Sequence, residues 1–388
     1  MRNIPFVKYT SCGNTFIIID ETTTEFLTEQ EKSAFAYHAT NSNFGVGSDN
    51  FIVIQPCRSP ILDRVRRYRR YWPHVPISNE MDYVFRMFEP DGTEAYSCAN
   101  GLMSCMQHIY KTYQKTSATF MTEIPAPVPG RVKSGINPIN RKTWVNLGSP
   151  RRVPDMLAAS GIKKPFEDTF DRMGEQTIRF RKHDLNPWYY KESIPLTGYL
   201  IFTGEPHLVI IVGENFPIKS LSDLLFIPPH FCSPAESMKT EKRFEFGTWL
   251  VQHIGHYFNC KLRHHFPKGI NVNFVRVNRR RKAVEYRCFE RGINKETLSC
   301  GTGGLASAYV ASRLGYIQQD TIPVLPYRCR CYDSDAQLII RKVKNEWVME
   351  GDPRLIFRGE SMVMDECLDT PLPRRLISQS SPVYSRAG

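Results

Sequence analysis

Apolar residues along the chain fall into short runs of strand length, separated by segments with helical spacing. The predicted strands lie at residues 6–9, 16–19, 51–54, 83–88, 144–147, 208–212, 271–277 and 283–289. Many of these runs are rich in Val, Ile and Phe, as expected of strands buried in a sheet. Helical spacing is found at residues 28–40 and directly after Cys98 and Cys300. The pattern predicts a mixture of strands and helices.

Other segments interrupt this pattern. Residues 57–81 combine arginines with prolines, and we expect them to be an inserted surface excursion. Residues 225–245, with two adjacent prolines, predict a second loop-like insert. Prolines also cluster at the junction of residues 1–125 and 126–340, which we expect to be the two halves of the chain. The Pro- and Ser-rich residues 364–388 predict a disordered tail.

Composition narrows the class of protein. Of 388 residues, 41% are hydrophobic and 23% are charged, which is typical of a soluble globular protein. No apolar run reaches the roughly 18–20 residues that span a bilayer. The N-terminal residues lack an apolar core followed by a cleavage site. We therefore expect a cytosolic enzyme or binding protein without a membrane partner.

The formal net charge of +12 raises the question of a polyanionic partner. The basic clusters are Arg58, Arg64, Arg66, Arg67, Arg69 and Arg70 in the first insert, and Arg279, Arg280, Arg281 and Lys282 further along. Tyr68, Tyr71 and Trp72 beside the first cluster could stack on nucleic-acid bases. Basic runs are more often solvated surface, so nucleic-acid binding is the weaker interpretation.

The cysteine and histidine spacing favours no metal site. Eleven cysteines are scattered along the chain, and in a reducing cytosol most should be free thiols. Cys329 and Cys331 stand without a second pair of ligands. His253, His256 and Cys260 have helical spacing but no zinc-finger pattern. We predict that the protein binds no metal.

One sequence element occurs twice. Cys98 is followed by Ala-Asn-Gly and a helical run, and Cys300 is followed by Gly-Thr-Gly and another helical run. The two cysteines lie about half the chain length apart. A chain built of two related halves, each with a cysteine at the start of a helix, explains this repetition.

A cysteine at a helix start has a particular chemistry. The helix N-terminus presents backbone N–H groups and a partial positive charge, which stabilise a thiolate and bind carboxylates. If two such starts face each other, their amides can hold one carboxylate while the two sulfurs flank the adjacent carbon. One thiolate would remove the α-proton of an amino acid and the opposite thiol would return one, without a cofactor. The acid and base must be distinct, because a single base tends to return the proton to the same face.

Two other interpretations of the paired cysteines stay open. Both residues could be structural, with no chemistry. They could also form a reversible disulfide that inactivates the enzyme, although a permanent disulfide is disfavoured in the cytosol.

At these residues the sequence resembles the diaminopimelate epimerase family, whose members convert LL- to meso-diaminopimelate without a cofactor. The motifs that carry the resemblance occur in one order along residues 1–363. They are SCGNTF at 11–16, FGVGSDN at 44–50, FEPDGTEA at 88–95, SCANG at 97–101, GEPH at 204–207, FPKGINV at 266–272, FERG at 289–292 and ETLSCGTG at 296–303.

The resemblance implies a fold and a set of site residues. The implied α/β (α+β) fold has two pseudo-symmetric halves, each a curled β-sheet wrapped around a central helix, with the active site in the cleft between them. Residues 341–363 would return to the first half as strands. Cys98 and Cys300 would be the acid and base pair. The backbone amides of Ala99, Asn100, Gly301 and Thr302 would hold the substrate carboxylate. His207 and Glu290 would tune the cysteines or contact the substrate amine, and Asn14, Asn50, Glu89, Glu205, Asn271 and Arg291 would line the rest of the pocket.

Several positions depart from the family pattern. Asn50 replaces the usual Gln, Ala99 replaces Gly, and Glu89 and Glu205 replace two Asn residues that normally hold the distal end of the substrate. Two carboxylates there would repel a distal carboxylate and attract a cation, although Arg291 could neutralise one of them. The predicted substrate is therefore diaminopimelate-like or a basic amino acid such as lysine, ornithine or arginine.

Three alternatives remain at this stage. The chain could be a strict diaminopimelate epimerase, or a related racemase of the proline type. It could also be a binding protein that lost the chemistry and holds a polyanion through its basic insert. The expected partner is a small amino-acid substrate rather than nucleic acid or a membrane, and a homodimer stays open.

Overall fold

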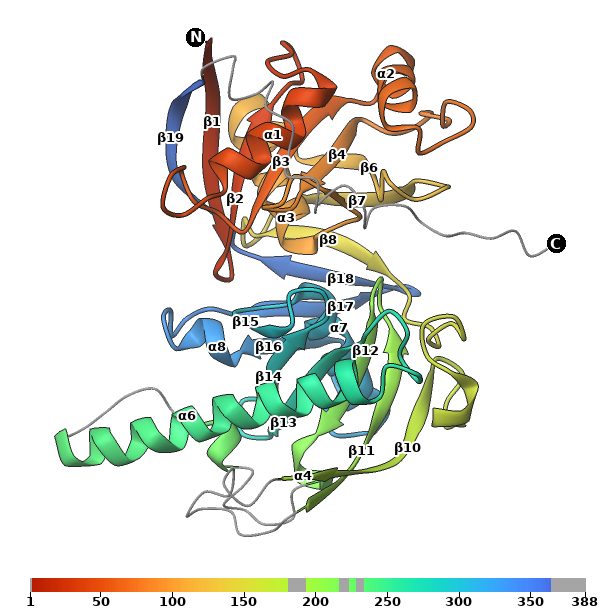
Figure 1. Cartoon of the computed structure of the whole chain (residues 1–388), viewed down its shortest axis with the longest axis vertical. Coiled ribbons are helices and arrows are strands. Elements are labelled where there is room, and N and C mark those ends of the chain that lie inside the picture. The colour runs from red at the N-terminus through yellow and green to blue at the C-terminus, as the bar shows by residue number, and fades with distance from the viewer. Residues whose placement is uncertain (1, 181–192, 216–222, 228–233, 364–388) are drawn as a thin grey trace. The chain divides into compact units, whose positions relative to one another are not determined.

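The computed structural model of the chain describes residues 2–180, 193–215, 223–227 and 234–363. The chain forms two compact units (Figure 1). Unit 1 comprises Met1–Asn146 and the chain from Gly351 onward, and unit 2 comprises Leu147–Glu350. The sequence instead places a domain boundary near residue 125, and the boundary of an independently folding domain stays a prediction. The predicted disordered tail, residues 364–388, lies outside the described residues.

Unit 1 is built on a mixed sheet. Its strands are β1 (Arg2–Ser11), β2 (Asn14–Asp20), β3 (Asn50–Pro56), β4 (Tyr83–Phe88), β5 (Glu94–Ala95), β6 (Ser117–Thr122), β7 (Gly130–Ile136), β8 (Thr143–Gly148) and β19 (Arg354–Val363). Its helices are α1 (Glu29–Ala39), α2 (Ser59–Arg69) and α3 (Ala99–Tyr113). The strands pair in the order β19-β1-β2-β3-β4-β6-β7-β8, with β5 on β4. The pairs β2–β3 and β4–β6 are parallel and the others are antiparallel.

Unit 2 has a sheet of the same kind. Its strands are β9 (Lys163–Pro165), β10 (Phe170–Arg179), β11 (Ser193–Phe202), β12 (Pro206–Ile211), β13 (Asn271–Asn278), β14 (Ala283–Glu290), β15 (Lys295–Thr297), β16 (Thr321–Pro326), β17 (Leu338–Val343) and β18 (Glu346–Gly351). Its helices include α4 (Val212–Asn215), α6 (Pro234–His256), α7 (Gly301–Arg313) and α8 (Tyr327–Arg330), with short turns η1 (Ser160–Ile162) and η3 (Tyr257–Lys261). The strand order is β9-β10-β11-β12-β13-β14-β16-β17-β18, with β15 on β14.

The two units repeat one topology. In unit 2 the pairs β12–β13 and β14–β16 are parallel, which matches β2–β3 and β4–β6 of unit 1. In each unit a helix that starts after a cysteine connects the second parallel pair: α3 in unit 1 and α7 in unit 2. The predicted mixed fold with two pseudo-symmetric halves is confirmed.

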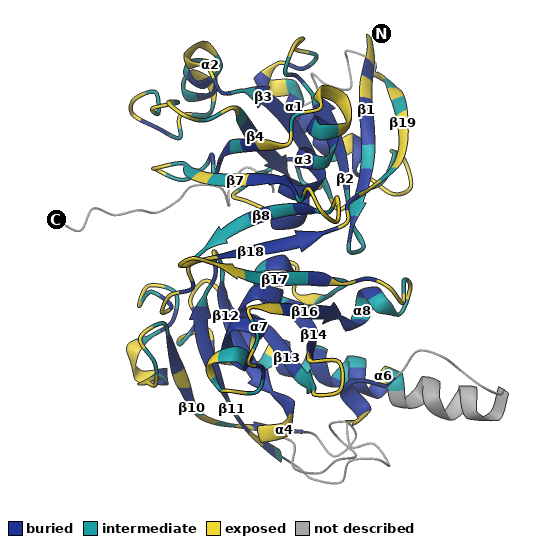
Figure 2. Ribbon diagram, turned by 180° about the vertical axis from the view of Figure 1, so that it is seen from behind, coloured by how far each residue is buried: buried dark blue, intermediate teal, exposed yellow. Residues whose placement is uncertain are grey.

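Each of these two helices is covered by its own sheet. Helix α3 contacts β1, β2, β6 and β7, and helix α7 contacts β11 to β14, β16 and β17. Both helices are buried around most of their circumference, as the dark blue ribbon in Figure 2 shows. A helix that is buried all round needs apolar or small residues on every face, which explains the Leu, Met, Ala and Gly of these two segments. Each sheet therefore curls around one central helix.

The first predicted insert is more ordered than the sequence suggests. Residues 57–81 contain helix α2, whose Leu62 and Val65 are buried in a small core with Trp72. The indole Nε1 of Trp72 donates to the carbonyl of Ala126 at 3.0 Å. Most of residues 57–81 are exposed or partly exposed, and apolar residues at helical spacing among the arginines give the segment a buried face. That the segment is an insert stays a prediction. Trp72 is 4% exposed, so it offers no surface for stacking on a base.

The second predicted insert is also partly helical. Helix α6 begins at Pro234 and covers most of the segment that we expected to be a loop. A proline is compatible with the first turn of a helix, because the N–H that it lacks has no intrahelical partner there. The loop prediction was therefore wrong from residue 234 onward. Residues 228–233 lie outside the described residues.

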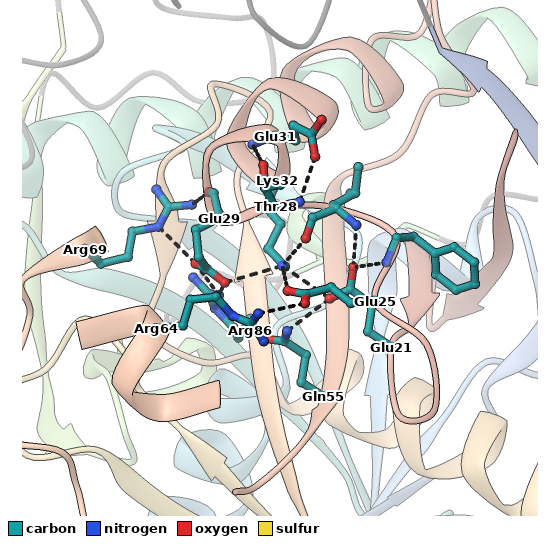
Figure 3. A network of polar contacts seen from close by, with 12 residues as sticks. Glu21, Glu25, Thr28, Glu29, Glu31, Lys32, Gln55, Arg64, Arg69 and Arg86 are labelled. Carbon is teal, nitrogen blue, oxygen red and sulfur yellow. Dashed lines mark hydrogen bonds and ion pairs between the residues drawn. The ribbon is translucent and has the colours of Figure 1, made fainter. Parts of the chain in front are cut away.

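A buried network of charges supports the sheet of unit 1 (Figure 3). The ammonium group of Lys32 is fully buried and lies 3.2 Å from a Glu21 oxygen and 3.3 Å from a Glu29 oxygen. The buried guanidinium of Arg86 lies 2.6 Å from Glu29 and 2.7 Å from Glu94. Buried charges are stable only when they are paired. Lys32 and Arg86 therefore tie α1 to the sheet.

The arginines of α2 are also engaged in ion pairs. Arg64 pairs with Glu25 at 2.9 Å, and Arg67 pairs with Asp63 at 2.6 Å. Arg69 donates to the carbonyl of Glu29 at 2.7 Å. Much of this basic cluster is thus compensated within unit 1. Among the helices of the described residues, none has the length and apolar character that a membrane crossing requires.

Candidate active site

Cys98 lies at the N-terminus of the central helix of unit 1. It is the N-cap residue of α3, and its sulfur accepts a hydrogen bond from the backbone N–H of Gly101 at 3.4 Å. A Cβ atom at Gly101 would lie 3.1 Å from Ile52 Cδ1 and 3.2 Å from Phe85 Cζ. The glycine of this turn therefore lets the helix start press against the sheet.

Two asparagines fix the turn beside Cys98. The side chain of Asn100 is buried, and its Nδ2 donates to Asn14 Oδ1 at 3.1 Å. The hydroxyl of Ser11 donates to Asn100 Oδ1 at 3.4 Å. Ala99, the first residue of α3, is buried as well. The predicted residues Asn14, Ala99 and Asn100 thus lie in one cluster with Cys98.

Asn50 and Glu89 form a second predicted group in unit 1. Asn50 begins β3, and its Nδ2 donates to a carboxylate oxygen of Glu89 at 2.9 Å. Burial raises the pKa of Glu89 to about 7, with the charges of Asp91 and Asp49 adding to the effect and the Asn50 hydrogen bond opposing it. A carboxyl group with this pKa is ready to gain or lose a proton near neutral pH.

A salt bridge braces the segment before each cysteine. In unit 1, Arg86 Nε and Nη2 donate to the two oxygens of Glu94 at 2.7 and 2.8 Å. In unit 2, Arg287 makes the same two bonds to Glu296, again at 2.7 and 2.8 Å. Each glutamate stands four residues before its cysteine. Sequence analysis missed this brace, although an Arg-x-Phe-Glu segment precedes both cysteines.

Cys300 begins the central helix of unit 2 and is held through its backbone. It is the N-cap residue of α7. The buried hydroxyl of Tyr286 accepts from the Cys300 N–H at 3.0 Å and donates to the Cys300 carbonyl at 2.9 Å. Gly301, the next residue, is also buried. Tyr286 therefore fastens the helix start to strand β14.

A chain of hydrogen bonds leads from the core of unit 2 to the sulfur of Cys300. Asn273 Nδ2 lies 3.0 Å from His207 Nδ1, His207 Nε2 lies 3.1 Å from Thr302 Oγ1, and Thr302 Oγ1 lies 3.5 Å from Cys300 Sγ. Burial, with a smaller contribution from Arg291, lowers the pKa of His207 to about 3. The imidazole is therefore neutral near pH 7.

The direction of this chain depends on the tautomer of His207. A neutral imidazole has one donor and one acceptor nitrogen, and either Thr302 Oγ1 or Cys300 Sγ can donate in the contact between them.

Glu205, Arg291 and Asn271 come together at another edge of unit 2. Arg291 Nε donates to a Glu205 oxygen at 2.7 Å, and its Nη2 forms an ion pair with the same carboxylate. The backbone N–H of Arg291 donates to Asn271 Oδ1 at 2.8 Å. The charge of Glu205 is therefore compensated by a bidentate partner within its own unit.

Glu290, the remaining predicted residue, lies beside Cys300. The hydroxyl of Thr297 donates to its carboxylate. The structure thus groups the predicted residues in two sets, one in each unit. Asn14, Asn50, Glu89, Cys98, Ala99 and Asn100 belong to unit 1, and Glu205, His207, Asn271, Glu290, Arg291, Cys300, Gly301 and Thr302 belong to unit 2.

Known proteins with similar sequences support the resemblance to diaminopimelate epimerases that the motifs predict. A family model for diaminopimelate epimerase matches residues 6–153. The diaminopimelate epimerase of Methanothrix thermoacetophila is 29% identical over 375 residues, covering 95% of this chain and 99% of that protein. The diaminopimelate epimerase of Methanocella arvoryzae is 28% identical over 366 residues, covering 93% of this chain and 97% of that protein. The chain is similar to the diaminopimelate epimerase family, as its motifs predict. These matches support an isomerase of the racemase and epimerase type.

Solved structures share the fold of this chain. A phenazine biosynthesis protein of the PhzF family from Bacillus anthracis aligns with a TM-score of 0.53 at 14% identity, covering 94% of this chain and 100% of that chain. A hydroxyproline epimerase from Agrobacterium vitis aligns with a TM-score of 0.52 at 10% identity, covering 92% of each chain. At these identities the likeness concerns the fold alone, and it confirms the predicted fold class.

Several polar residues around Cys300 were not predicted from the sequence. Asn273, at the inner end of the hydrogen-bond chain, stands two residues after Asn271 on β13 and shares its face of the strand. Tyr286 and Cys288 lie four and two residues before Glu290 on β14, so they share its face of that strand. The two-residue period of a strand that ends in Glu290 is the signal that could have found them.

Proposed function

We propose that this chain inverts the α-carbon of an amino acid, with Cys98 and Cys300 as the paired acid and base and without pyridoxal phosphate. The observation that supports the proposal is the repeated position of the two residues. Each is the N-cap of the buried central helix of its unit. The first backbone N–H groups of a helix have no intrahelical partner and attract an anion.

In this proposal the two helix starts share one substrate. The amides of Ala99 and Asn100, and those of Gly301 and Thr302, hold the carboxylate next to the reacting carbon. One thiolate removes the α-proton, and the carbanion charge spreads onto the carboxylate, where the preorganised N–H groups stabilise it. The thiol on the other face then delivers its proton, and the configuration is inverted.

We propose diaminopimelate as the substrate that fits the distal residues best. Its distal end carries both an ammonium and a carboxylate group. The ion pair of Glu205 with Arg291 likewise presents both charges, so it complements a zwitterionic end better than a simple cation. The curated relatives quoted above are named for the same activity.

A basic amino acid is the second candidate, and Glu89 is the observation that favours it. This carboxyl group is held by the neutral side chain of Asn50, and in its ionised form it would attract a substrate ammonium. Both candidates agree with acidic side chains among the predicted substrate-binding residues. A proline-type substrate, a small ring without a cationic end, is favoured by neither Glu89 nor Glu205.

The test is deuterium incorporation at the α-carbon in heavy water, read by mass spectrometry and chiral chromatography. We expect exchange and inversion with LL-diaminopimelate and much slower exchange with lysine, ornithine and arginine. Cys98→Ala and Cys300→Ala should each reduce the rate by about 10²–10⁴-fold, the usual contribution of a general acid or base. Cys57→Ala removes a buried thiol far from either cysteine in sequence, and it should leave the rate within about twofold.

Other outcomes would distinguish the alternatives. Exchange with basic amino acids alone would transfer the assignment to the second candidate. No exchange with any of these substrates by the reduced protein would contradict the proposed function. Salt-sensitive binding to a polyanion that survives Cys98→Ala would instead support a binding protein without catalysis.

A further inference from the structure

A third cysteine lies beside Cys300 and has no role in the proposed reaction. The sulfur atoms of Cys288 and Cys300 and a carboxylate oxygen of Glu290 all lie within 4.8 Å of one another. Within the described part of the chain, no other group of three or more His, Cys, Asp or Glu residues is this compact. Cys288 and Cys300 are buried thiols, and Glu290 is partly exposed.

The period of strand β14 explains why these groups meet. Tyr286, Cys288 and Glu290 are two residues apart, so their side chains leave the same face of the strand. Tyr286 holds the backbone of Cys300 against that face by its two hydrogen bonds. Cys288 pairs with Thr297 in the neighbouring strand, and Thr297 donates to the Glu290 carboxylate. Packing and pairing thus fix all three groups without any ligand.

This set of donors matches a thiophilic divalent cation. Zinc binds thiolate at about 2.3 Å and carboxylate oxygen at about 2.0–2.2 Å, with tetrahedral geometry. Two sulfurs on one such ion lie roughly 3.8 Å apart, and a sulfur and an oxygen roughly 3.5 Å apart. The three donor atoms lie within 4.8 Å of one another, so small side-chain adjustments would bring them to these distances. Three protein ligands would leave the fourth position open to water.

The site exists in unit 2 alone among the described residues. The bidentate braces align Arg86 with Arg287, so that Met87 of unit 1 corresponds to Cys288. Met87 is buried next to Phe88 on β4. The thioether of a methionine is a weaker ligand for zinc than a thiolate, and it carries no charge. Unit 1 therefore has the same fold around its cysteine but lacks the second thiolate ligand.

In place of the sequence-based prediction that the protein binds no metal, we propose that Cys288, Cys300 and Glu290 form a binding site for one thiophilic divalent cation such as Zn²⁺. Metal binding requires only the geometry of this cluster. Its consequence for catalysis rests on the proposed function. Because Cys300 would be both a metal ligand and the acid or base, a bound ion and turnover exclude each other. The site is therefore inhibitory.

Cobalt titration of the reduced full-length protein tests the metal site directly. Co²⁺ reports its own ligands, because thiolate bound to it gives a charge-transfer band in the near ultraviolet and tetrahedral coordination gives intense visible bands. We expect one equivalent to bind to the wild type with both signatures, and Zn²⁺ to displace it. Competition with a chromophoric chelator then gives the affinity for zinc.

The variants separate this site from other thiols. Cys288→Ala should lose the charge-transfer band or weaken zinc binding at least about 100-fold, since even losing a hydrogen-bond partner of a ligand costs 10–100-fold. Cys300→Ala should do the same. Cys57→Ala is the matched control, because burial and the charge of Asp82 raise the pKa of that thiol to about 11 and it lies outside the cluster. Circular dichroism checks that each variant is folded.

The results are read in two independent ways. A wild type without the sulfur-to-cobalt band, or a Cys288→Ala variant with an undiminished band, would overturn the metal site. If cobalt binds as expected but no amino acid undergoes α-proton exchange, the metal site stands and the proposed function fails. If exchange occurs, micromolar zinc should inhibit it in the wild type, a chelator should restore it, and Cys288→Ala should resist the inhibition.

Discussion

Glu89→Gln is the most informative substitution for the proposed substrate site. Glutamine keeps the size of the side chain and can still accept a hydrogen bond from Asn50, but it cannot ionise. In the native protein Glu89 is partly buried, and this burial raises the pKa of its carboxyl group to about 7. The substitution therefore removes one titration and little else.

The expected magnitude follows from this pKa. About one tenth of Glu89 is ionised at pH 6 and about nine tenths at pH 8, so affinity for a substrate ammonium should rise about tenfold across this range. KM should fall accordingly as the pH increases. Glu89→Gln should abolish the slope and hold KM at or above the value of the wild type at pH 6.

The same titration affects stability in the opposite direction. A folded-state pKa above the unfolded value of 4.5 means that the folded state binds the proton more tightly. Its stabilising effect is complete below the unfolded pKa and is lost as the pH rises through 7. Without substrate, Glu89→Gln should therefore be more stable than the wild type at pH 8 by up to about 3 kcal/mol, and equally stable at pH 4.5.

The assay combines initial rates of α-proton exchange with urea unfolding at pH 4.5, 6, 7 and 8. Glu205→Gln is the matched control, since Glu205 is already ion-paired with Arg291. It should weaken substrate binding while leaving the slope of KM between pH 6 and 8 in place. A flat wild-type profile of KM, or equal stability of the two proteins at pH 8, would refute the role assigned to Glu89.

Three further substitutions probe the frame of the site. Arg86→Met leaves buried carboxylates without their partner and should lower the free energy of unfolding by about 3–5 kcal/mol, against less than about 1 kcal/mol for the exposed Arg64→Met; urea unfolding measures both. Burial lowers the pKa of His207 to about 3, so between pH 6 and 4 the unfolded state binds a proton that the folded state does not. The free energy of unfolding of the wild type should therefore fall over this range by about 1.4 kcal/mol per pH unit more than that of His207→Gln. Thr302→Val removes the hydroxyl that lies 3.5 Å from the Cys300 sulfur. A hydroxyl that donates to this sulfur would make the variant about 10-fold slower in α-proton exchange, whereas Thr302→Ser should retain the wild-type rate.

Much of the fold could be predicted from local pattern. The strands at residues 16–19, 51–54 and 271–277 are continuous runs of apolar or alternating residues, and their pattern reflects burial in a sheet. The helices after Cys98 and Cys300 were predicted because small residues followed by apolar ones mark a helix start and its buried body. These signals lie within a few residues of each other, so no knowledge of the tertiary structure was needed.

The two inserts could not be predicted in the same way. Leu62 and Val65 have helical spacing, but the surrounding arginines suggest a solvated loop. Only the tertiary structure shows their partners: Arg64 reaches Glu25 at 2.9 Å, and Arg69 reaches the carbonyl of Glu29 at 2.7 Å. A charge cluster is indistinguishable from a binding surface until its counter-ions, distant in sequence, are located.

In the candidate site, too, local motifs could be predicted and contacts between distant residues could not. The two cysteine turns were evident because they repeat, and a repeated local motif is visible in one sequence. The hydrogen-bond chain from Asn273 through His207 to Thr302 joins three separate elements, and no spacing rule connects them. Likewise the pairing of Arg291 with Glu205 was considered as an alternative, but the choice between pairing and a net acidic site depended on geometry.

The two units share a fold and differ in the side chains near the cysteine. Both brace the approach to the cysteine with a bidentate Arg–Glu pair, which holds the helix start against its own sheet. Unit 1 then offers Asn100, fixed by neutral partners, and a titratable Glu89. Unit 2 offers a hydroxyl 3.5 Å from the Cys300 sulfur and a second thiol within 4.8 Å of it. The two sulfurs of the proposed acid and base pair therefore have unequal surroundings. Among the described residues, Cys300 is the one of the two that lies beside the groups that would bind a thiophilic metal.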